Sequence, residues 1–298
     1  MPELPEVETV RRGLQSLIVG KIPTKAMVFD SPKSFPNALT DVEQFLYGAT
    51  VKSVRRRAKV LLIDLSSDYS LVIHLKMTGQ LVFVGDQRFA AGHPNDSMVG
   101  VLPDRSTRVE LTFTDGTHLY FNDQRKFGWV KLFPTIEVPN IDFMKKVGPE
   151  PLLDDFTPEI LYERLQRRKK SIIKAAILDQ TVLAGVGNIY ADESLWGARI
   201  HPETRVGDLS RDEITKLHHE IRAVMNLSIE KGGSTNKNYV NAEGKKGSYM
   251  EFANVFRREG QACNRCGAVI TKIRAAGRGT HVCLYCQTSP MREQPVLP

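Results

Sequence analysis

The four cysteines of the chain stand in two Cys-x-x-Cys pairs near its end, and no other feature constrains the fold as strongly. Cys263 and Cys266 form the first pair, Cys283 and Cys286 form the second, and sixteen residues separate the pairs. Two such pairs place four thiolates tetrahedrally around one zinc ion and leave no open position for chemistry. Two disulfides or free thiols are the alternatives, which a cytosolic location disfavours. We therefore expect one structural Zn²⁺ per subunit.

The segment between the two pairs predicts a β-hairpin. Its middle reads Ala-Ala-Gly-Arg-Gly-Thr-His over 275–281, so that glycines free the backbone at the tip and Arg278 projects from it. A projecting arginine fits into a groove or against a phosphate. Taken alone, such an arginine is just as often a solvated surface charge.

The charge of the chain favours a polyanionic partner. The formal net charge is +7, and residues 254–298 hold seven basic residues against two acidic ones. Composition alone does not separate DNA from RNA or anionic lipid. No apolar run approaches the roughly 20 residues that span a bilayer, and the acidic start lacks the regions of a secretion signal. We expect a cytoplasmic protein without a membrane partner.

The first half of the chain predicts a helix followed by an antiparallel β-sandwich. Apolar residues recur at helical spacing from Pro5 to Ile18, and short β-rich runs follow. Thr78-Gly79 and Asp115-Gly116 are expected hairpin turns, and 84–107 reads as a long surface loop with no assigned chemistry. The β-rich runs are 51–57, 60–65, 71–76, 81–84, 108–114, 117–122 and 128–133.

The second half predicts helices after a proline-rich linker over 134–151. One helix starts at the Thr157-Pro158 cap, and others cover 171–179 and 188–196. A longer helix begins at a capping box of Ser210 and Glu213 and stops at Gly232-Gly233; residues 232–250 should be mobile. The fold class is α+β and multidomain, with a β-sandwich domain over 1–134, linker, helical domain and mobile loop over 135–250, and a zinc hairpin over 251–298.

The start of the chain offers a nucleophile. Removal of Met1 leaves Pro2 with a free secondary amine, which attacks an aldehydic sugar carbon to give an iminium ion without a metal. An α-amine has an unperturbed pKa near 8, so a usable fraction is neutral at physiological pH. Glu3 lies beside it as a potential acid or base. On these three residues alone, a frayed tail is the better interpretation.

Six motifs in order along nearly the whole chain change that interpretation, because together they resemble the formamidopyrimidine-DNA glycosylase family. The motifs are PELPEVETVRRGL at the start, RRRAKVLL near 59, HLKMTG near 77, DQRKFG near 125, GVGNIYADE near 188, and the two cysteine pairs. The resemblance implies a monomeric bacterial enzyme, associated with the nucleoid through DNA, that excises oxidised purines from double-stranded DNA and cleaves abasic sites by β,δ-elimination.

The resemblance also implies catalytic roles. Pro2 attacks C1′ of the damaged nucleotide, and Glu3 manages protons during ring opening and elimination. Lys59 falls between two β-rich runs and would position and protonate the substrate; without the resemblance it reads as an ordinary surface lysine beside Arg55, Arg56 and Arg57. Glu6 assists, or serves only the helix start.

Further positions would hold DNA. Met77, Arg125 and Phe127 would fill the space left by the extruded nucleotide and contact the estranged base, although periodicity alone places Met77 and Phe127 in a strand core. The GVGNIYADE segment resembles the helix-two-turn-helix of the family, in which Asn188 binds a backbone phosphate. The remaining members of the set are His74 and Lys174 as DNA contacts, Glu193 in the site, and Arg278 on the phosphate of the extruded nucleotide.

One departure from the family stands before the first cysteine pair. The family pattern there resembles VYGREG, whereas this chain reads Val-Phe-Arg-Arg-Glu-Gly over 255–260. Phe256 has no hydroxyl to donate to a phosphate. Either Arg257 or Arg258 takes over that contact, or lesion affinity is weaker than in relatives.

Two other functions compete. The sister branch, which resembles endonuclease VIII, removes oxidised pyrimidines with the same Pro2 and Glu3, but Leu4 and the complete filling set favour the purine branch. A DNA-binding protein that has lost its enzymology would have no need for Pro2, Glu3 and Lys59.

Overall fold

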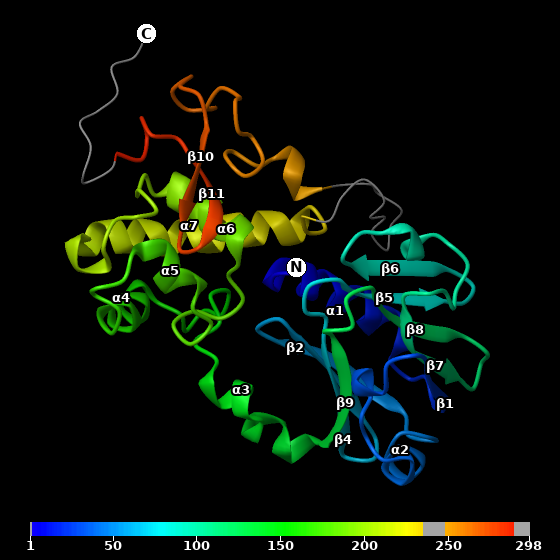
Figure 1. Cartoon of the computed structure of the whole chain (residues 1–298). Coiled ribbons are helices and arrows are strands. Elements are labelled where there is room, and N and C mark those ends of the chain that lie inside the picture. The colour runs from blue at the N-terminus through cyan, green and yellow to red at the C-terminus, as the bar shows by residue number, and fades with distance from the viewer. Residues whose placement is uncertain (1, 235–247, 289–298) are drawn as a thin grey trace. The chain divides into compact units, whose positions relative to one another are not determined.

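The computed structural model describes residues 2–234 and 248–288, which form two compact units (Figure 1). The first unit contains 2–145 together with 229–234 and 248, and the second contains 146–228 and 249–288. The helices between residues 158 and 228 and the cysteine-bearing hairpin therefore share one unit. The domain boundaries predicted near 134 and 250 remain predictions, because the two units are defined by spatial contacts and not by segments of the sequence.

Two antiparallel sheets form the first unit, as the alternating β-rich runs predict. One has the strand order β1-β7-β8-β5-β6 and the other the order β2-β3-β4-β9. The hairpin at Asp115-Gly116 is confirmed, because β7 and β8 pair across it. The strands are β1 (Pro23–Val28), β2 (Val51–Arg57), β3 (Val60–Leu65), β4 (Tyr69–His74), β5 (Gly79–Val84), β6 (Arg88–Gly92), β7 (Thr107–Phe113), β8 (His118–Asp123) and β9 (Trp129–Pro134).

The first helix, α1 (Leu4–Ile18), joins the core of the sandwich. Val7, Val10 and Leu14 are fully buried and belong to the same apolar cluster as the inward-facing residues of both sheets. Gly13 lies against the ring of Phe89, so a side chain at that position would collide with β6. The helix that begins next to Pro2 is therefore held by the core along its length.

Two sequence predictions for the first unit were wrong, the hairpin turn at Thr78-Gly79 and the surface loop over 84–107. Thr78-Gly79 is not a hairpin turn, because it carries the chain from β4 in one sheet to β5 in the other. The 84–107 stretch contains β6 and the 3-10 turn η2 (Asp96–Met98), and Arg88 bonds three carbonyls there. The stretch predicted as a linker contains the boundary between the two units, and its first part is helical and covers the outer face of β3. These pieces are η3 (Thr135–Asn140) and α3 (Asp142–Lys146); η1 (Pro32–Ser34) and α2 (Leu39–Phe45) complete the unit.

The second unit is mainly helical, and its predicted caps are present. Thr157 accepts a hydrogen bond from Ile160 N, and Ser210 exchanges hydrogen bonds with Glu213. The predicted mobile region 232–250 lies mostly outside the described residues. The elements are α4 (Pro158–Gln166), α5 (Ile173–Leu178), α6 (Asn188–Gly197), η4 (Val206–Asp208), α7 (Arg211–Glu230), η5 (Tyr249–Glu251), β10 (Thr271–Ala275) and β11 (Arg278–Val282).

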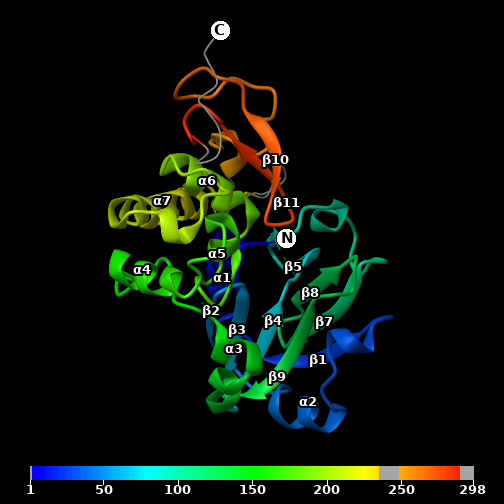
Figure 2. The ribbon, with the colours of Figure 1, turned by 60° about the vertical axis from the view of Figure 1, so that its left-hand side comes forward.

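The hairpin of β10 and β11 lies beside α6 (Figure 2). Ala275 pairs with Arg278, so Ala276 and Gly277 form a two-residue turn with positive φ angles of 52° and 69°. The predicted tip is therefore confirmed, with Arg278 as the first residue of the returning strand. Within the described residues, none of the helices has the length and hydropathy to span a membrane.

Candidate functional site

The start of the chain is held in place and is not frayed. Pro2 and Glu3 are both buried, with Glu3 only 4% exposed. Glu3 N donates to the Glu6 carboxylate at 2.8 Å, and the other oxygen of Glu6 accepts from Ser234 N at 2.7 Å. These bonds fix the position of the first described residues before α1 begins. The sequence predicted that Glu6 either assists catalysis or serves only the start of the helix. In the structure its carboxylate links the backbone of Glu3 to the backbone of Ser234.

Lys59 lies in a two-residue turn between β2 and β3, as predicted. Arg57 pairs with Val60, and Ala58 has a φ of +52°. Arg56 ties this turn to the N-terminal helix: its guanidinium bonds Ala58 O at 3.0 Å and Glu8 of α1 at 3.1 Å. One arginine thus connects the helix that follows Pro2 to the turn that carries Lys59.

The Glu8 end of this link is charged. Burial by itself raises the pKa of the Glu8 carboxyl, but hydrogen bonds and positive charges from Arg11, Arg56 and Arg12 bring the pKa below its ordinary value. The carboxylate is therefore ionised at neutral pH, and its bonds to the arginines are charge-assisted. Sequence reasoning missed Glu8 and Arg56, because forty-eight residues separate them.

Asp123 organises the turn over 124–127. One of its oxygens accepts from the Thr78 hydroxyl and from Arg125 N at 3.2 Å, and the other accepts from Phe127 N at 2.8 Å and Gly128 N at 2.6 Å. The carboxylate is fully buried. It therefore fixes both the DQRKFG turn and the residue that follows Met77, although it was absent from the predicted site.

The turn held by Asp123 projects two predicted DNA contacts. Phe127 is 53% exposed, and the Arg125 guanidinium lies over its ring, 4.7 Å from the centroid. Met77 is half-buried beside Thr78. The strand-core alternative is wrong for Phe127, since a core residue does not expose half of its surface. An exposed aromatic ring stacked with a cation is suited to contact bases.

His74 ends β4 as a neutral imidazole. Burial, together with the positive charges of Lys76 and Lys59, lowers the pKa of His74 to about 3. Its Nδ1 accepts a hydrogen bond from Lys76 N at 3.1 Å, so the ring proton resides on Nε2. In the protein without DNA, His74 is therefore neutral at physiological pH, with the Nε2–H as its one ring donor.

Lys174 has a different environment from the one predicted for a DNA contact. Its side chain is fully buried, and its ammonium bonds Asp192 and the Thr280 hydroxyl, each at 2.6 Å. The second Asp192 oxygen accepts from His281 N at 2.9 Å. A side chain buried to this degree does not present its charge to a phosphate. The structure instead gives Lys174 the role of joining α5, α6 and β11.

Asn188 adds a third bond between the helices and the hairpin. It is the first residue of α6, and its side-chain amide donates to Gly279 O at 3.0 Å. The preceding loop is held by Gln180, which donates to Val186 O and accepts from Gly185 N. The start of α6 therefore presents the positive end of the helix dipole next to the residue that follows Arg278.

Glu193 anchors the segment that leads to the first cysteine. Its carboxylate accepts from the backbone N–H groups of Asn254, Val255 and Phe256 at 2.8, 2.9 and 2.8 Å. The side chain is 1% exposed. Glu193 therefore holds the backbone of this segment rigidly, which is a structural role in the second unit.

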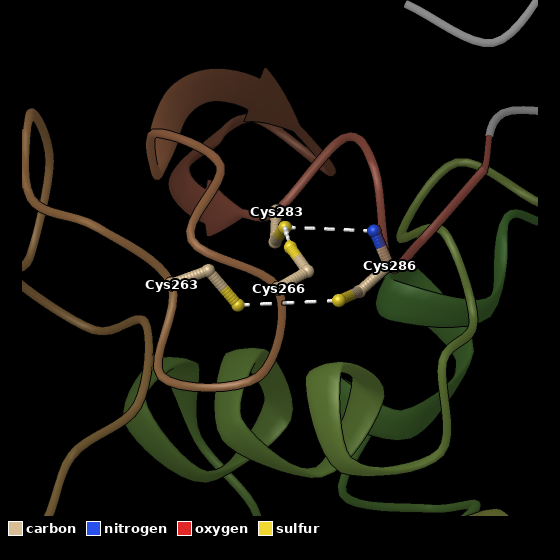
Figure 3. Close-up of side chains that lie close together, drawn as sticks. All are labelled: Cys263, Cys266, Cys283 and Cys286. Atoms are coloured by element: carbon tan, nitrogen blue, oxygen red, sulfur yellow. Dashed lines mark hydrogen bonds between the residues drawn. The ribbon is translucent and has the colours of Figure 1, made fainter. Parts of the chain in front are cut away.

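The four cysteines form a centre that fits zinc. Their sulfur atoms all lie within 4.8 Å of one another and point toward a common centre (Figure 3). Zn–S bonds of about 2.3 Å place tetrahedral sulfurs roughly 3.8 Å apart, and the separations Cys263–Cys286 and Cys266–Cys283 are 3.9 and 3.5 Å. Trp196 Nε1 and Arg265 N donate to Cys263 Sγ, as suits a thiolate ligand. The predicted site is thus assembled, and a zinc ion there would be structural.

Chelation is expected to unfold this centre in the wild-type protein. Metal analysis should give one zinc per chain before treatment, and the thermal midpoint should fall after it, because binding free energy at such sites contributes to folding. Cys283→Ser should melt at a lower temperature than the wild type and be insensitive to the chelator. A wild-type midpoint that is the same with and without chelator contradicts the zinc assignment.

Three family models match successive segments of the chain. Family models match for the formamidopyrimidine-DNA glycosylase N-terminal domain over 1–130, the H2TH domain of the same enzyme over 147–239, and a zinc finger found in FPG and IleRS over 260–288. The matched modules coincide with the sandwich, the helices and the cysteine centre.

Curated relatives and solved structures cover nearly the whole chain. The formamidopyrimidine-DNA glycosylases of Pediococcus pentosaceus and Chloroflexus aurantiacus are 43% and 41% identical over 96% of this chain and 99% and 98% of theirs. Lactococcus lactis Fpg, solved in complex with DNA containing an abasic site, has 36% sequence identity to this chain and a TM-score of 0.84. The match covers 96% of this chain and 100% of the Lactococcus lactis chain. The chain therefore belongs to the formamidopyrimidine-DNA glycosylase family of zinc-finger DNA-repair enzymes.

Proposed function

We propose that the protein excises oxidised purines from double-stranded DNA with the amine of Pro2 as nucleophile and then cleaves the strand at the abasic site. The observation that carries this proposal is the fixed N-terminus. Pro2 and Glu3 are buried, and the Glu3 backbone N–H is hydrogen-bonded to Glu6, whereas the tail interpretation requires a loose end. A Lactococcus lactis relative has been solved with Fapy-dG DNA, which supports a purine lesion as substrate.

Base excision and strand cleavage both proceed through a bond between the Pro2 nitrogen and C1′ of the damaged nucleotide. The Pro2 nitrogen forms a bond to C1′ while the bond from C1′ to the base breaks, and the base leaves with the bonding electrons and takes up a proton. The sugar ring opens to an iminium ion, with Glu3 supplying the proton to the ring oxygen. Elimination then removes a proton from C2′ as the C3′–O bond breaks and a proton from C4′ as the C5′–O bond breaks, the phosphates leave with the bonding electrons, and hydrolysis of the remaining iminium releases Pro2.

The other site residues are proposed to act on the same substrate. Lys59 positions and protonates it from the β2–β3 turn, and Arg278 binds the phosphate of the extruded nucleotide. Met77, Arg125 and Phe127 fill the vacated stack, which the exposed Arg125–Phe127 pair supports. His74 and Asn188 bind backbone phosphates. We also infer a monomeric, cytoplasmic protein, in keeping with a DNA substrate.

Borohydride trapping tests the proposal. Borohydride reduces the iminium ion to a stable amine, so the processed protein should become covalently attached to duplexes bearing 8-oxoguanine or an abasic site. A preparation that keeps Met1 should not be trapped, because its nucleophilic nitrogen is blocked. Absence of trapping on both duplexes defeats the proposal, and trapping on an oxidised-pyrimidine duplex in preference to 8-oxoguanine favours the endonuclease VIII branch.

A further inference from the structure

Arg257 has a backbone conformation that is unfavourable for its side chain. Its φ is +60°, in the left-handed region that glycine adopts freely and that other residues adopt at a cost. The family pattern resembled by this segment has glycine at the same place. Residues held in such conformations are often retained for a functional reason, which raises the question of what the arginine does.

The conformation is imposed by the surrounding backbone. The Glu193 carboxylate holds the N–H groups of residues 254–256, and Arg258 N donates to Val255 O at 3.0 Å to close a turn around Arg257. The segment cannot relax to suit the side chain without breaking these buried bonds. Arg257 is therefore displayed from a rigid support.

Arg258 is already engaged within its own loop. Its guanidinium donates to Asn254 O and Ala262 O, each at 3.0 Å, and to Gln261 Oε1 at 3.1 Å. These three bonds use all of its nitrogens to brace the loop before the first cysteine pair. Of the two arginines that the sequence left as alternatives, Arg258 thus serves the fold.

Arg257 is exposed, and its guanidinium makes no hydrogen bond or ion pair within residues 2–234 and 248–288. Its one described side-chain contact is the ring of Phe256, whose centroid lies 5.8 Å from the guanidinium carbon. A guanidinium that is fixed at its backbone and free at its tip is suited to capture a phosphate.

The position beside the hairpin fits such a ligand. The Phe256 ring packs edge-to-face on His281 of β11, with ring centroids 5.0 Å apart. Arg257 is therefore the next residue after one that contacts β11, the strand whose first residue is Arg278. Phe256 and Arg257 also line a recess of about 370 Å³, formed by residues between 250 and 264. Its polar lining comes from Arg257, Arg258, Gln261, Asn264 and the carboxylate of Glu251.

We propose that Arg257 binds a DNA backbone phosphate, in place of the tyrosine hydroxyl that the family pattern has at position 256. The proposal rests on the DNA-repair function and adds to it a contact specific to this chain. A charged donor replaces a neutral one, so the contact depends more strongly on salt than a hydroxyl contact does.

The test is the salt dependence of binding to a duplex that carries tetrahydrofuran, a stable abasic analogue. R257G should bind about fivefold to tenfold more weakly at moderate salt, with a slope of log affinity against log salt that is smaller by about 1. Its thermal midpoint should rise by roughly 2 °C, because glycine removes the unfavourable conformation.

Arg199 offers a matched control. It is also an exposed arginine in the second unit, and its φ is +59°, but it lies just after the end of α6. R199G should gain the same stability and lose the same charge while keeping the wild-type slope. An unchanged slope in R257G, or an equal loss in R199G, overturns the proposal.

Rescue provides a second measurement. The double variant F256Y/R257G restores the family pattern and should recover most of the affinity that R257G loses. A double variant that binds as weakly as R257G overturns the claim that the two groups serve one phosphate. Borohydride trapping of the wild type and of R257G, at saturating concentrations, separates this outcome from a failure of the proposed function: trapping of both shows that the chemistry is intact.

Discussion

Pro2→Gly is expected to lose base excision while keeping measurable strand cleavage at abasic sites. Removal of Met1 leaves glycine with a primary amine, which still forms an imine with the open-chain aldehyde of an abasic sugar. Expulsion of an intact base needs the stronger secondary amine held at C1′ by the proline ring. Single-turnover rates should fall by about 10²-fold or more on 8-oxoguanine and far less on the abasic duplex.

Pro5→Ala is the matched control for this variant. Pro5 lies in the first turn of α1, so its loss alters the helix start without touching the nucleophile. The control should excise 8-oxoguanine at nearly the wild-type rate. Mass spectrometry must confirm that Met1 is removed from both variants. Full excision by Pro2→Gly would falsify the role assigned to the proline amine.

Asp123→Ala is expected to have the second large effect. The substitution leaves the N–H groups of Phe127 and Gly128 and the Thr78 hydroxyl without their buried acceptor. The free energy of unfolding of the first unit should fall by about 3 kcal/mol. Because the turn over 124–127 is then no longer fixed, preference for lesion DNA over undamaged DNA should fall by about 10-fold or more.

Asp104→Ala separates loss of the turn from general loss of stability. Asp104 accepts hydrogen bonds from Ser106 N and the Ser106 hydroxyl in a different loop of the same unit. Its loss should lower stability without changing lesion preference. Fluorescence of 2-aminopurine opposite the lesion reports base unstacking directly. If Asp123→Ala unstacks that base as the wild type does, the organising role of Asp123 is wrong.

Local patterns predicted those elements whose determinants lie close together in sequence. The strands at 51–57 and 60–65 and the turn between them were placed correctly, because alternating and continuous apolar runs meet at a short polar break. The cysteine spacing predicted the metal centre for the same reason. By contrast, β6 was missed, since its sequence is short and rich in glycine and alanine.

Contacts between distant residues could not be predicted. The resemblance predicts a DNA contact at Lys174, and only the fold brings Asp192 and Thr280 to it, 18 and 106 residues away. Asp123 reads as a strand end, since its partner Thr78 lies 45 residues earlier. In both cases the residue type was visible, but its partner was set by tertiary structure.

The Glu8–Arg56 link has a consequence for motion. Helix α1 and the β2–β3 turn are joined by a charge-assisted bond and share one packed core, so thermal fluctuations should carry the helix that follows the proposed nucleophile and the turn with Lys59 in the same direction. Correlated displacement preserves the spacing between two reactive groups even while both move relative to solvent. We therefore expect the distance between the start of α1 and the turn with Lys59, which matters for proton transfer, to vary little. Other distances in this unit should vary more.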